Sequence, residues 1–368
     1  MYYNAYKEKK LSALGLGMMR LPKDENGSVD EVLTAEMIKK AIENGVNYFD
    51  TAYVYHHGES ENIAGRLLSK YPRESYNLAS KYPGFLSNLP DDPAEIFEEQ
   101  LKKCNTEYFD FYLLHSMTDD RVDFYADGPI LPYLLEQKKN GRIMHLGFSS
   151  HCSPDGLARF LEKAGQYMEF CQIELNYLDW TYQDAKKQYE IIRSYGLDVW
   201  VMEPVRGGKL ANLPENLAAK LKAVNPDVTQ ASWGFRWLQR LDGIAMILSG
   251  MSNMEQLDDN LKTFSERVPL DDESAELLLN IAEELKHSVP CTGCRYCCDG
   301  CPMALNIPEL IKIYNVFLLG DKYDAKEMLS ALPDEEKPNN CLSCGACSSV
   351  CPQGIDIPDV MAKLSELL

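Results

Sequence analysis

Apolar and polar positions in the first 285 residues alternate between two kinds of pattern. Short segments rich in β-branched and aromatic residues recur at regular intervals, and amphipathic segments separate them. The amphipathic kind is seen in TAEMIKKAIENG (34–45) and DPAEIFEEQLKKC (92–104), where apolar residues return every three or four positions. The pattern predicts strands alternating with helices, as in an α/β protein with a parallel sheet.

Eight segments have the character of strands. They are residues 14–21, 48–52, 76–81, 109–115, 143–150, 170–176, 198–204 and 244–250. Eight βα units over this length favour a closed (β/α)8 TIM barrel, whose catalytic groups lie at the C-terminal ends of its strands. An open doubly wound sheet is the alternative, but it often has a glycine-rich first turn that GLGMMR does not supply. We expect residues 1–286 to form the barrel and residues 287–368 a second domain.

Composition changes this picture mainly by exclusion. The chain has 368 residues and a formal net charge of −19, which disfavours nucleic acid as a partner. It has no run of 18 apolar residues, and MYYNAYKEKK at its start lacks the apolar segment of a signal peptide, so no membrane association is expected. Twelve cysteines without a secretion signal indicate reduced thiols that bind metal or do redox work, and a cytoplasmic location.

Two cysteine runs near the C-terminus share one spacing. CTGCRYCCDGCP (291–302) and CLSCGACSSVCP (341–352) both read C-x2-C-x2-C-x3-C-P. In two-cluster ferredoxins with this spacing the fourth cysteine binds the other cluster, which predicts two [4Fe-4S] clusters. The predicted ligands are Cys291, Cys294, Cys297 and Cys351 for the first cluster, and Cys341, Cys344, Cys347 and Cys301 for the second. Structural zinc is the alternative, but it usually takes paired CxxC knuckles separated by a longer loop.

The other four cysteines do not fit this spacing. Cys298 is predicted to be a spare thiol, and Cys104, Cys152 and Cys171 to be small core residues.

The repeat extends beyond the cysteines at a constant offset of 50. ALNIPELI (304–311) matches GIDIPDVM (354–361), and Asn306 and Asp356 have the character of helix N-caps. The residues between the two runs are apolar at helical spacing. Residues 287–368 are therefore expected to be all-helical, and they resemble the helical ferredoxin domains of fumarate reductase and succinate dehydrogenase iron–sulfur subunits.

Four titratable residues fall at or near predicted strand ends. They are Asp50, Tyr55, Lys81 and His115. A phenol with an ordinary pKa of about 10 acts as a general acid near neutral pH only if that pKa is lowered. Lys81 could stabilise the phenolate, with Asp50 pairing with and orienting the lysine. His115 could hydrogen-bond the reacting oxygen.

With these residues in place, positions 12 to 265 resemble the aldo-keto reductase family. The resemblance rests on DTAYVYHHGESE, SKYP, LLHS, GFSS, QIELNY, EPVRGGKL and SGMSNMEQLDDN. It implies that the four residues form a catalytic tetrad, that NADPH donates hydride to a carbonyl carbon, and that Tyr55 protonates the oxygen. The family's steroid double-bond reductases have glutamate in place of His115, so the resemblance implies carbonyl rather than alkene reduction.

The resemblance also implies a nucleotide site. Its residues would be Met18, Arg20, Ser149, Gln172, Met202, Gly250, Ser252, Gln256 and Asn260. Ser149 and Gln172 stand where the family holds the nicotinamide carboxamide, and Met202 replaces the aromatic residue that commonly stacks on the ring.

Two departures from the family bear on the nucleotide. Gly250 and Gln256 replace basic residues that usually bind the 2′-phosphate, so the cofactor is expected to be NADP or NAD. Glu203 falls near the pyrophosphate path, where a carboxylate weakens binding unless it is paired; Arg206 or Lys209 is the expected partner.

The two predicted domains move electrons differently, because hydride transfer moves two at once and a [4Fe-4S] cluster moves one. We expect an oxidoreductase that reduces a small carbonyl compound and whose clusters exchange electrons with a flavin or with a ferredoxin or flavoprotein partner. Two alternatives stay open. The clusters could stabilise their domain beside an ordinary reductase, or the protein could be an electron-transfer iron–sulfur protein in which the barrel is a binding scaffold.

Overall fold

The computed structural model describes residues 1–286, 288–318 and 322–367. The chain divides into two compact units. The first is Met1–Pro204 with Ser232–Leu270, and the second is Val205–Ala231 with Asp271–Leu368. This division places two stretches of the predicted barrel sequence, residues 205–231 and 271–286, with the C-terminal segment, and each stretch contains a helix. The domain boundary at residue 286, which follows the sequence motifs, stays a prediction.

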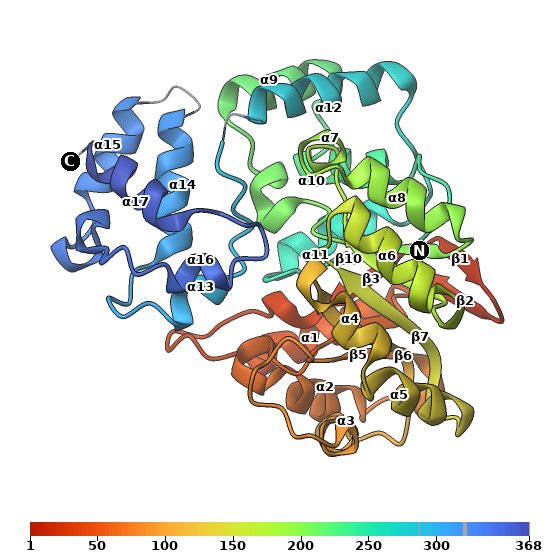
Figure 1. The fold of residues 1–368 in the computed structure, drawn as a ribbon. Helices are drawn as coiled ribbons and strands as arrows, with labels where there is room; N and C mark the ends of the chain where they lie inside the picture. Colours follow the sequence, from red (N-terminus) through yellow and green to blue (C-terminus); the bar gives the residue numbers. More distant parts are fainter. Residues whose placement is uncertain (287, 319–321, 368) are drawn as a thin grey trace. The chain divides into compact units, whose positions relative to one another are not determined.

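Eight parallel strands close a barrel in the order β10-β3-β4-β5-β6-β7-β8-β9 (Figure 1). The strands are β3 (Leu14–Gly17), β4 (Tyr48–Asp50), β5 (Asn77–Tyr82), β6 (Phe109–Met117), β7 (Ile143–Ser150), β8 (Phe170–Glu174), β9 (Asp198–Met202) and β10 (Ile244–Ser249). Each falls on a predicted segment, with ends that differ by a few residues. The predicted (β/α)8 barrel is confirmed, and the open doubly wound sheet is wrong.

Helices follow the strands along the chain. In the first unit they are α1 (Glu31–Glu43), α2 (Ser60–Leu68), α3 (Pro93–Lys103), α4 (Val122–Asp127), α5 (Ile130–Lys139), α6 (Pro154–Ala164), α7 (Asp179–Tyr182), α8 (Ala185–Ser194), α10 (Gln230–Leu238, from Ser232 on) and α11 (Met254–Thr263). Aspartate caps set two of the starts. The Asp30 carboxylate accepts from two amides of α1, and that of Asp92 accepts from the Ala94 amide of α3. The first cap explains why α1 begins three residues before the predicted segment.

An N-terminal hairpin that the sequence did not predict packs on the barrel core. Its strands are β1 (Tyr3–Tyr6) and β2 (Lys9–Ser12). The Tyr6 ring lies 4.9 Å from that of Trp200 and 5.8 Å from that of Phe111. Because Phe111 and Phe170, in the same buried cluster, lie near strand starts, the hairpin covers the N-terminal end of the barrel. The C-terminal strand ends lie at the other end.

The second unit contains α9 (Glu215–Val224), α12 (Asp272–Leu285), α13 (Tyr296–Asp299), α14 (Ile307–Leu318), α15 (Lys322–Ser330), α16 (Ala346–Ser349) and α17 (Ile357–Ser365). Within 288–318 and 322–367 every regular element is helical, as predicted. Figure 1 shows α14 beside α15 and α17. Leu310, Ile313 and Leu364 belong to one buried cluster of this unit. Residues 319–321 of the predicted helical stretch lie outside the described residues.

The offset of 50 is preserved in three dimensions. α16 and α17 begin 50 residues after α13 and α14, and Arg295 and Gly345, which precede the short helices, have φ of 70° and 75°. Asp356 caps α17 by accepting from the Asp359 amide, as predicted. The side-chain oxygen of Asn306 instead accepts from Arg295 at 3.1 Å. The two halves therefore share a backbone but differ in side-chain chemistry.

Among the described residues, no helix is long and apolar enough to cross a membrane.

Candidate functional site

Asp50 and Lys81 form a buried ion pair at the C-terminal ends of β4 and β5. The Lys81 ammonium donates to Asp50 Oδ1 at 2.5 Å and to the Thr51 carbonyl at 2.6 Å, and the lysine has no exposed surface. Burial raises the pKa of Asp50 and lowers the pKa of Lys81, and their mutual attraction opposes both shifts. Two acceptors, Asp50 Oδ1 and the Thr51 carbonyl oxygen, hold the Lys81 ammonium in one position.

Tyr55 and His115 complete the group. Lys81 Nζ lies 5.0 Å from the centre of the Tyr55 ring, and the Tyr55 and His115 rings are 6.0 Å apart and almost perpendicular. Phe85 packs on His115 with its ring 5.2 Å away. His115 Nδ1 is buried and has no hydrogen-bond partner among the described residues, so it is available to a ligand. The structure brings all four residues of the expected tetrad together.

The electrostatics of Tyr55 differ from the expectation. Burial raises the pKa of Tyr55 well above its ordinary value, and the carboxylates of Asp50 and Glu203 raise it further. Among the leading influences only Arg20 lowers it. The predicted lowering of the Tyr55 pKa is therefore not observed, and the main physical reason is the burial of the phenol, to which the two carboxylates add. The phenol is held in its protonated, proton-donating form.

Three of the predicted nicotinamide residues lie together at neighbouring strand ends. Ser149 and Gln172 are paired in register across β7 and β8, and Gln172 Nε2 donates to the Met202 sulfur at 3.5 Å. Gln172 Oε1 is buried without a hydrogen-bond partner among the described residues. An unpaired buried carbonyl is costly, so this atom fits a ligand that donates an N–H, as a carboxamide does.

Within the first unit Glu203 pairs with Arg20, a partner that the sequence did not suggest. Arg20 Nη2 lies 2.9 Å from Glu203 Oε1. Glu203 has φ of 52°, a backbone conformation that few residues other than glycine adopt. This turn directs the carboxylate to the loop after β3, and the pairing with Arg206 or Lys209, which belong to the second unit, stays a prediction.

Of the remaining predicted nucleotide residues, some lie in the loop after β10 and others are buried. Ser252 ties the loop after β10 to the loop after β3, because its hydroxyl donates to the Arg20 carbonyl and its amide donates to Gln256 Oε1. A Cβ on Gly250 would lie 3.0 Å from Cβ of Arg20, so this loop packs closely. Met18 is fully buried, and buried Asn260 donates to Ser249 Oγ at 2.9 Å. Their nucleotide roles stay predictions.

Sequence reasoning missed Phe85 and the Arg20–Glu203 pair. Phe85 lies in the loop KYPGFLSN, where no periodicity marks it as a wall of the site. The charge of Arg20 and that of Glu203 were visible, but 183 positions separate them.

The eight cysteines line two small cavities in the second unit. The wall of one cavity includes Cys291, Cys294, Cys297 and Cys351. The wall of the other includes Cys301, Cys341, Cys344 and Cys347. Each cavity thus receives three thiols from one run and the fourth from the other run. This is the arrangement that the spacing predicted.

The grouping of the thiols suits a cluster better than a single ion. Among the residues described, no three or more His, Cys, Asp or Glu side chains are placed to hold a single metal ion. Each set surrounds a cavity instead, as four thiolates do when each binds its own iron of a cluster. The Gly293 amide donates to Cys291 Sγ and the Ser343 amide to Cys341 Sγ, both at 3.4 Å. Such bonds to ligand sulfurs tune a cluster's potential.

The other four cysteines do not line these cavities. Cys104, Cys152 and Cys171 are buried in the barrel unit as expected. Cys298 is next to Cys297 but is not among the residues that line either cavity.

Comparisons with known proteins agree with a barrel that carries the tetrad and a C-terminal segment that carries the cysteine sets. The family model "Aldo/keto reductase family" matches residues 13–283, and the model "4Fe-4S dicluster domain" matches residues 290–355. The chain is 26% identical over 290 residues to a probable aldo-keto reductase of Glycine max, covering 68% of this chain and 80% of that protein. It is 26% identical over 324 residues to the NADH-specific methylglyoxal reductase of Escherichia coli, covering 75% and 96%.

Solved structures share the barrel fold. The aldo-keto reductase AKR11C1 of Bacillus halodurans, in its holo form, has a TM-score of 0.62 at 24% identity, covering 76% of this chain and 96% of that one. A Klebsiella pneumoniae aldo/keto reductase in complex with NADP and acetate has a TM-score of 0.61 at 18% identity, covering 75% and 93%. The family match spans well over half of the sequence and is followed by a 4Fe-4S dicluster domain, and the chain therefore belongs to the aldo/keto reductase family.

Proposed function

We propose that the protein reduces a small carbonyl compound at the tetrad Asp50, Tyr55, Lys81 and His115, and that its C-terminal segment holds two [4Fe-4S] clusters for one-electron transfer. The observation that carries the first half is the convergence of the four side chains, with Lys81 Nζ bonded to Asp50 and 5.0 Å from the Tyr55 ring. The two cysteine-lined cavities support the second half.

The proposed chemistry assigns one task to each side chain. Bound NAD(P)H would supply the hydride. Tyr55 holds its proton because its pKa is raised, and it gives that proton up when negative charge develops on the substrate oxygen. Burial lowers the pKa of His115 well below its ordinary value, so the neutral imidazole can donate a hydrogen bond to the same oxygen. Lys81, fixed by Asp50, faces the tyrosine ring and stabilises the phenolate that forms.

The nucleotide site is proposed for NADH as well as NADPH. Gln172 Oε1 and Ser149 would hold the carboxamide, and Arg20 would have to leave Glu203 to meet the pyrophosphate. Gly250 and Gln256 offer no positive charge for a 2′-phosphate. The methylglyoxal reductase among the relatives is described as NADH-specific. Methylglyoxal with NADH is accordingly the first pair to test.

The clusters are proposed to hold about eight irons per chain in the two cysteine sets. They would exchange electrons one at a time with an external carrier of the ferredoxin or flavoprotein class. Cytoplasmic thiol chemistry and an oxygen-poor setting suit this role, because exposed clusters react with oxygen.

Replacing Tyr55 by phenylalanine tests the proposal. The phenol proton is lost, so NADH-dependent reduction of methylglyoxal should fall by about 10²- to 10⁴-fold while the visible absorbance of the clusters is unchanged. Tyr53→Phe is the matched control, since this nearby hydroxyl bonds only to Glu99 among the contacts seen. Full activity in Tyr55→Phe would place the chemistry elsewhere. No carbonyl turnover and no nicotinamide binding by the intact protein would favour the electron-carrier alternative.

A further inference from the structure

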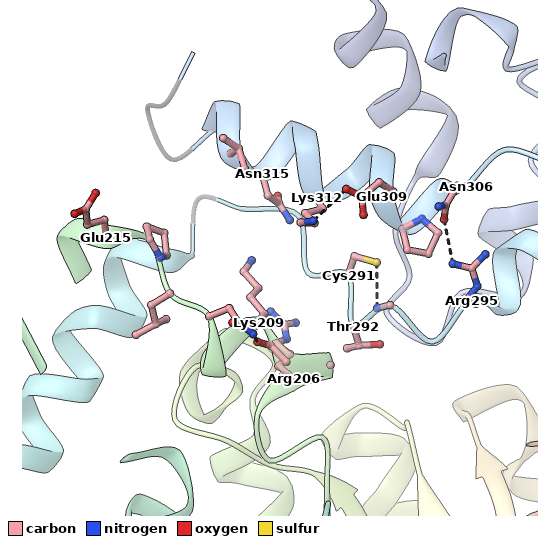
Figure 2. A pocket seen from close by; sticks show the side chains of 18 of the residues that line it. Arg206, Lys209, Glu215, Cys291, Thr292, Arg295, Asn306, Glu309, Lys312 and Asn315 are labelled. Carbon is pink, nitrogen blue, oxygen red and sulfur yellow. Dashed lines mark hydrogen bonds and ion pairs between the residues drawn. The ribbon is translucent and has the colours of Figure 1, made fainter. Parts of the chain in front are cut away.

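The second unit contains a large cleft outside the cysteine cavities. Its volume is about 1320 Å³, above the roughly 300–1,000 Å³ typical of small-molecule sites. One wall is the loop and helix start at 206–219, and the other is formed by the first cysteine run and α14. Figure 2 shows Arg206 and Lys209 on the first wall and Cys291, Arg295 and Lys312 on the second. These five residues define what we call the cationic cleft.

The charge of the cleft contrasts with that of the chain. Four basic side chains line it, against the two carboxylates of Glu215 and Glu309, although the protein as a whole carries −19. Glu309 is engaged with Lys312 at 3.1 Å. Lys209 donates to the Ser288 hydroxyl. The cleft therefore attracts an anion.

Comparison of the two repeats shows that this charge is particular to the first one. Four lining positions differ in charge from their equivalents 50 residues later, and each differs in the positive direction. The pairs are Arg295 and Gly345, Asn306 and Asp356, Lys312 and Ala362, and Val316 and Glu366. The same backbone thus carries a cationic face in the first repeat and an anionic or neutral one in the second.

Arg295 is the most informative of these positions. It has φ of 70°, a conformation that disfavours a side chain, and the equivalent residue in the second repeat is glycine. Its guanidinium bonds to Asn306, where the second repeat has an aspartate that would neutralise it. A strained arginine with a neutral partner, facing a cleft, is suited to bind an anionic group such as phosphate.

The cleft and the first cluster cavity share a wall. Cys291, Thr292, Arg295 and Pro308 line both. A molecule in the cleft would therefore lie against Cys291, a proposed cluster ligand, and could exchange electrons with that cluster. Leu213, Pro214 and Val316 add apolar surface to the lining, so the occupant should combine an anionic group with an apolar body.

We propose that the cationic cleft binds a phosphorylated flavin, of which flavin mononucleotide (FMN) is the simplest. The cleft has the charge for the phosphate and the volume and apolar surface for the ring system. Flavins exchange electrons both in pairs and singly, which is the conversion that a hydride-transferring barrel and one-electron clusters require. The proposal rests on the redox role of the clusters in the proposed function, but binding is measured independently of turnover.

The test is a titration of the full-length, iron-loaded protein with FMN under anaerobic conditions, followed by quenching of flavin fluorescence and by equilibrium dialysis. The intact protein should bind about one FMN per chain, and riboflavin, which lacks the phosphate, should bind at least about tenfold more weakly. Lys209→Gln should weaken FMN binding by about tenfold and leave riboflavin binding unchanged.

A matched pair of lysines provides the control. Lys312 and Lys363 each lie on the helix after a cysteine run and pair with an acid three or four residues earlier, but only Lys312 lines the cleft. Lys312→Gln should weaken FMN binding and Lys363→Gln should not. Tyr55→Phe should leave FMN binding unchanged, so that failure of carbonyl reduction is seen separately. No FMN binding by the intact protein, equal binding of riboflavin, or equal effects of the two lysine variants would overturn the proposal.

Discussion

The barrel and the C-terminal segment position their reactive groups by different means. The tetrad comes from positions 50 to 115 on separate strands and loops, and an interior of packed rings such as Tyr48, Phe111 and Trp200 fixes the strands beneath it. The eight cysteines come from two short runs, each of which contains a single helix of only four residues, and only two of the eight thiols are buried. The difference indicates that packing inside the barrel fixes the tetrad without a ligand, whereas the cysteine thiols need the bound clusters to fix their positions.

Removing the iron should produce the largest difference between the barrel and the C-terminal segment. Chelation should unfold residues 288–367 and leave the barrel folded, because the free energy of metal binding contributes directly to the folding of small metal domains. Limited proteolysis followed by mass spectrometry should show cleavage confined to that segment. Equal resistance of both regions to protease after iron loss would contradict the contrast.

Adjacent cysteines offer the control for that experiment. Cys297→Ser should remove one cluster, about four irons per chain. Cys298→Ser should keep the full iron content, since Cys298 lines neither cavity.

The buried ion pair gives the next largest effect. Lys81→Met leaves the Asp50 carboxylate buried without its partner, so it should lower the free energy of unfolding of the barrel by about 3–5 kcal/mol and abolish carbonyl reduction. Urea unfolding followed by tryptophan fluorescence measures the first effect. Lys103→Met is the control, because its pair with Glu99 at 2.7 Å is partly exposed and contributes about 1 kcal/mol or less. Similar losses from both variants would mean that burial of the first pair is irrelevant.

Two neighbouring glycines test how closely a loop of the second unit packs on the first cysteine run. Gly207 and Gly208 have φ of 63° and 93°, so alanine is strained at either position. Only at Gly207 would a Cβ collide, 1.8 Å from the Thr292 carbonyl of the first cysteine run. Gly207→Ala should therefore destabilise the packing of this loop on that run by roughly 1–3 kcal/mol more than Gly208→Ala does. Hydrogen exchange of the 291–301 amides would measure it, and equal protection in both variants would contradict the contact.

The smallest of the expected effects is the pH dependence of the barrel's stability that His115 contributes. Burial lowers the pKa of His115 far below the value of about 6.5 that it has in the unfolded chain. The unfolded state therefore binds more protons below that pH, and the stability present above pH 6.5 is lost as the pH falls. The slope from this residue is at most about 1.4 kcal/mol per pH unit.

The midpoint of urea unfolding, measured by tryptophan fluorescence at pH 7.5 and pH 5.5, checks this prediction. The drop should be smaller in His115→Gln than in the unaltered protein, while the exposed His57→Gln should behave like the unaltered protein. The same drop in His115→Gln would assign the acid sensitivity to other groups.

The sequence alone determined the elements and the sets of reactive residues. Short strand-like segments recurring between helical patterns located all eight barrel strands, and fixed cysteine spacing divided the thiols into the two sets that line the two cavities. These features are local, or repeat at a constant offset, and backbone geometry converts such regularities directly into structure. The hairpin at Tyr3–Tyr6 and Lys9–Ser12 escaped detection because its strands are too short to show alternation.

Only the tertiary structure decided which long side chains meet. Glu203 pairs with Arg20 across 183 positions, and burial together with two nearby carboxylates raises the pKa of Tyr55 instead of lowering it. The cationic cleft likewise joins segments around residues 206 and 291 that share no pattern. Long-range pairing and burial depend on distances that the packed chain sets, so no local regularity of the sequence encodes them.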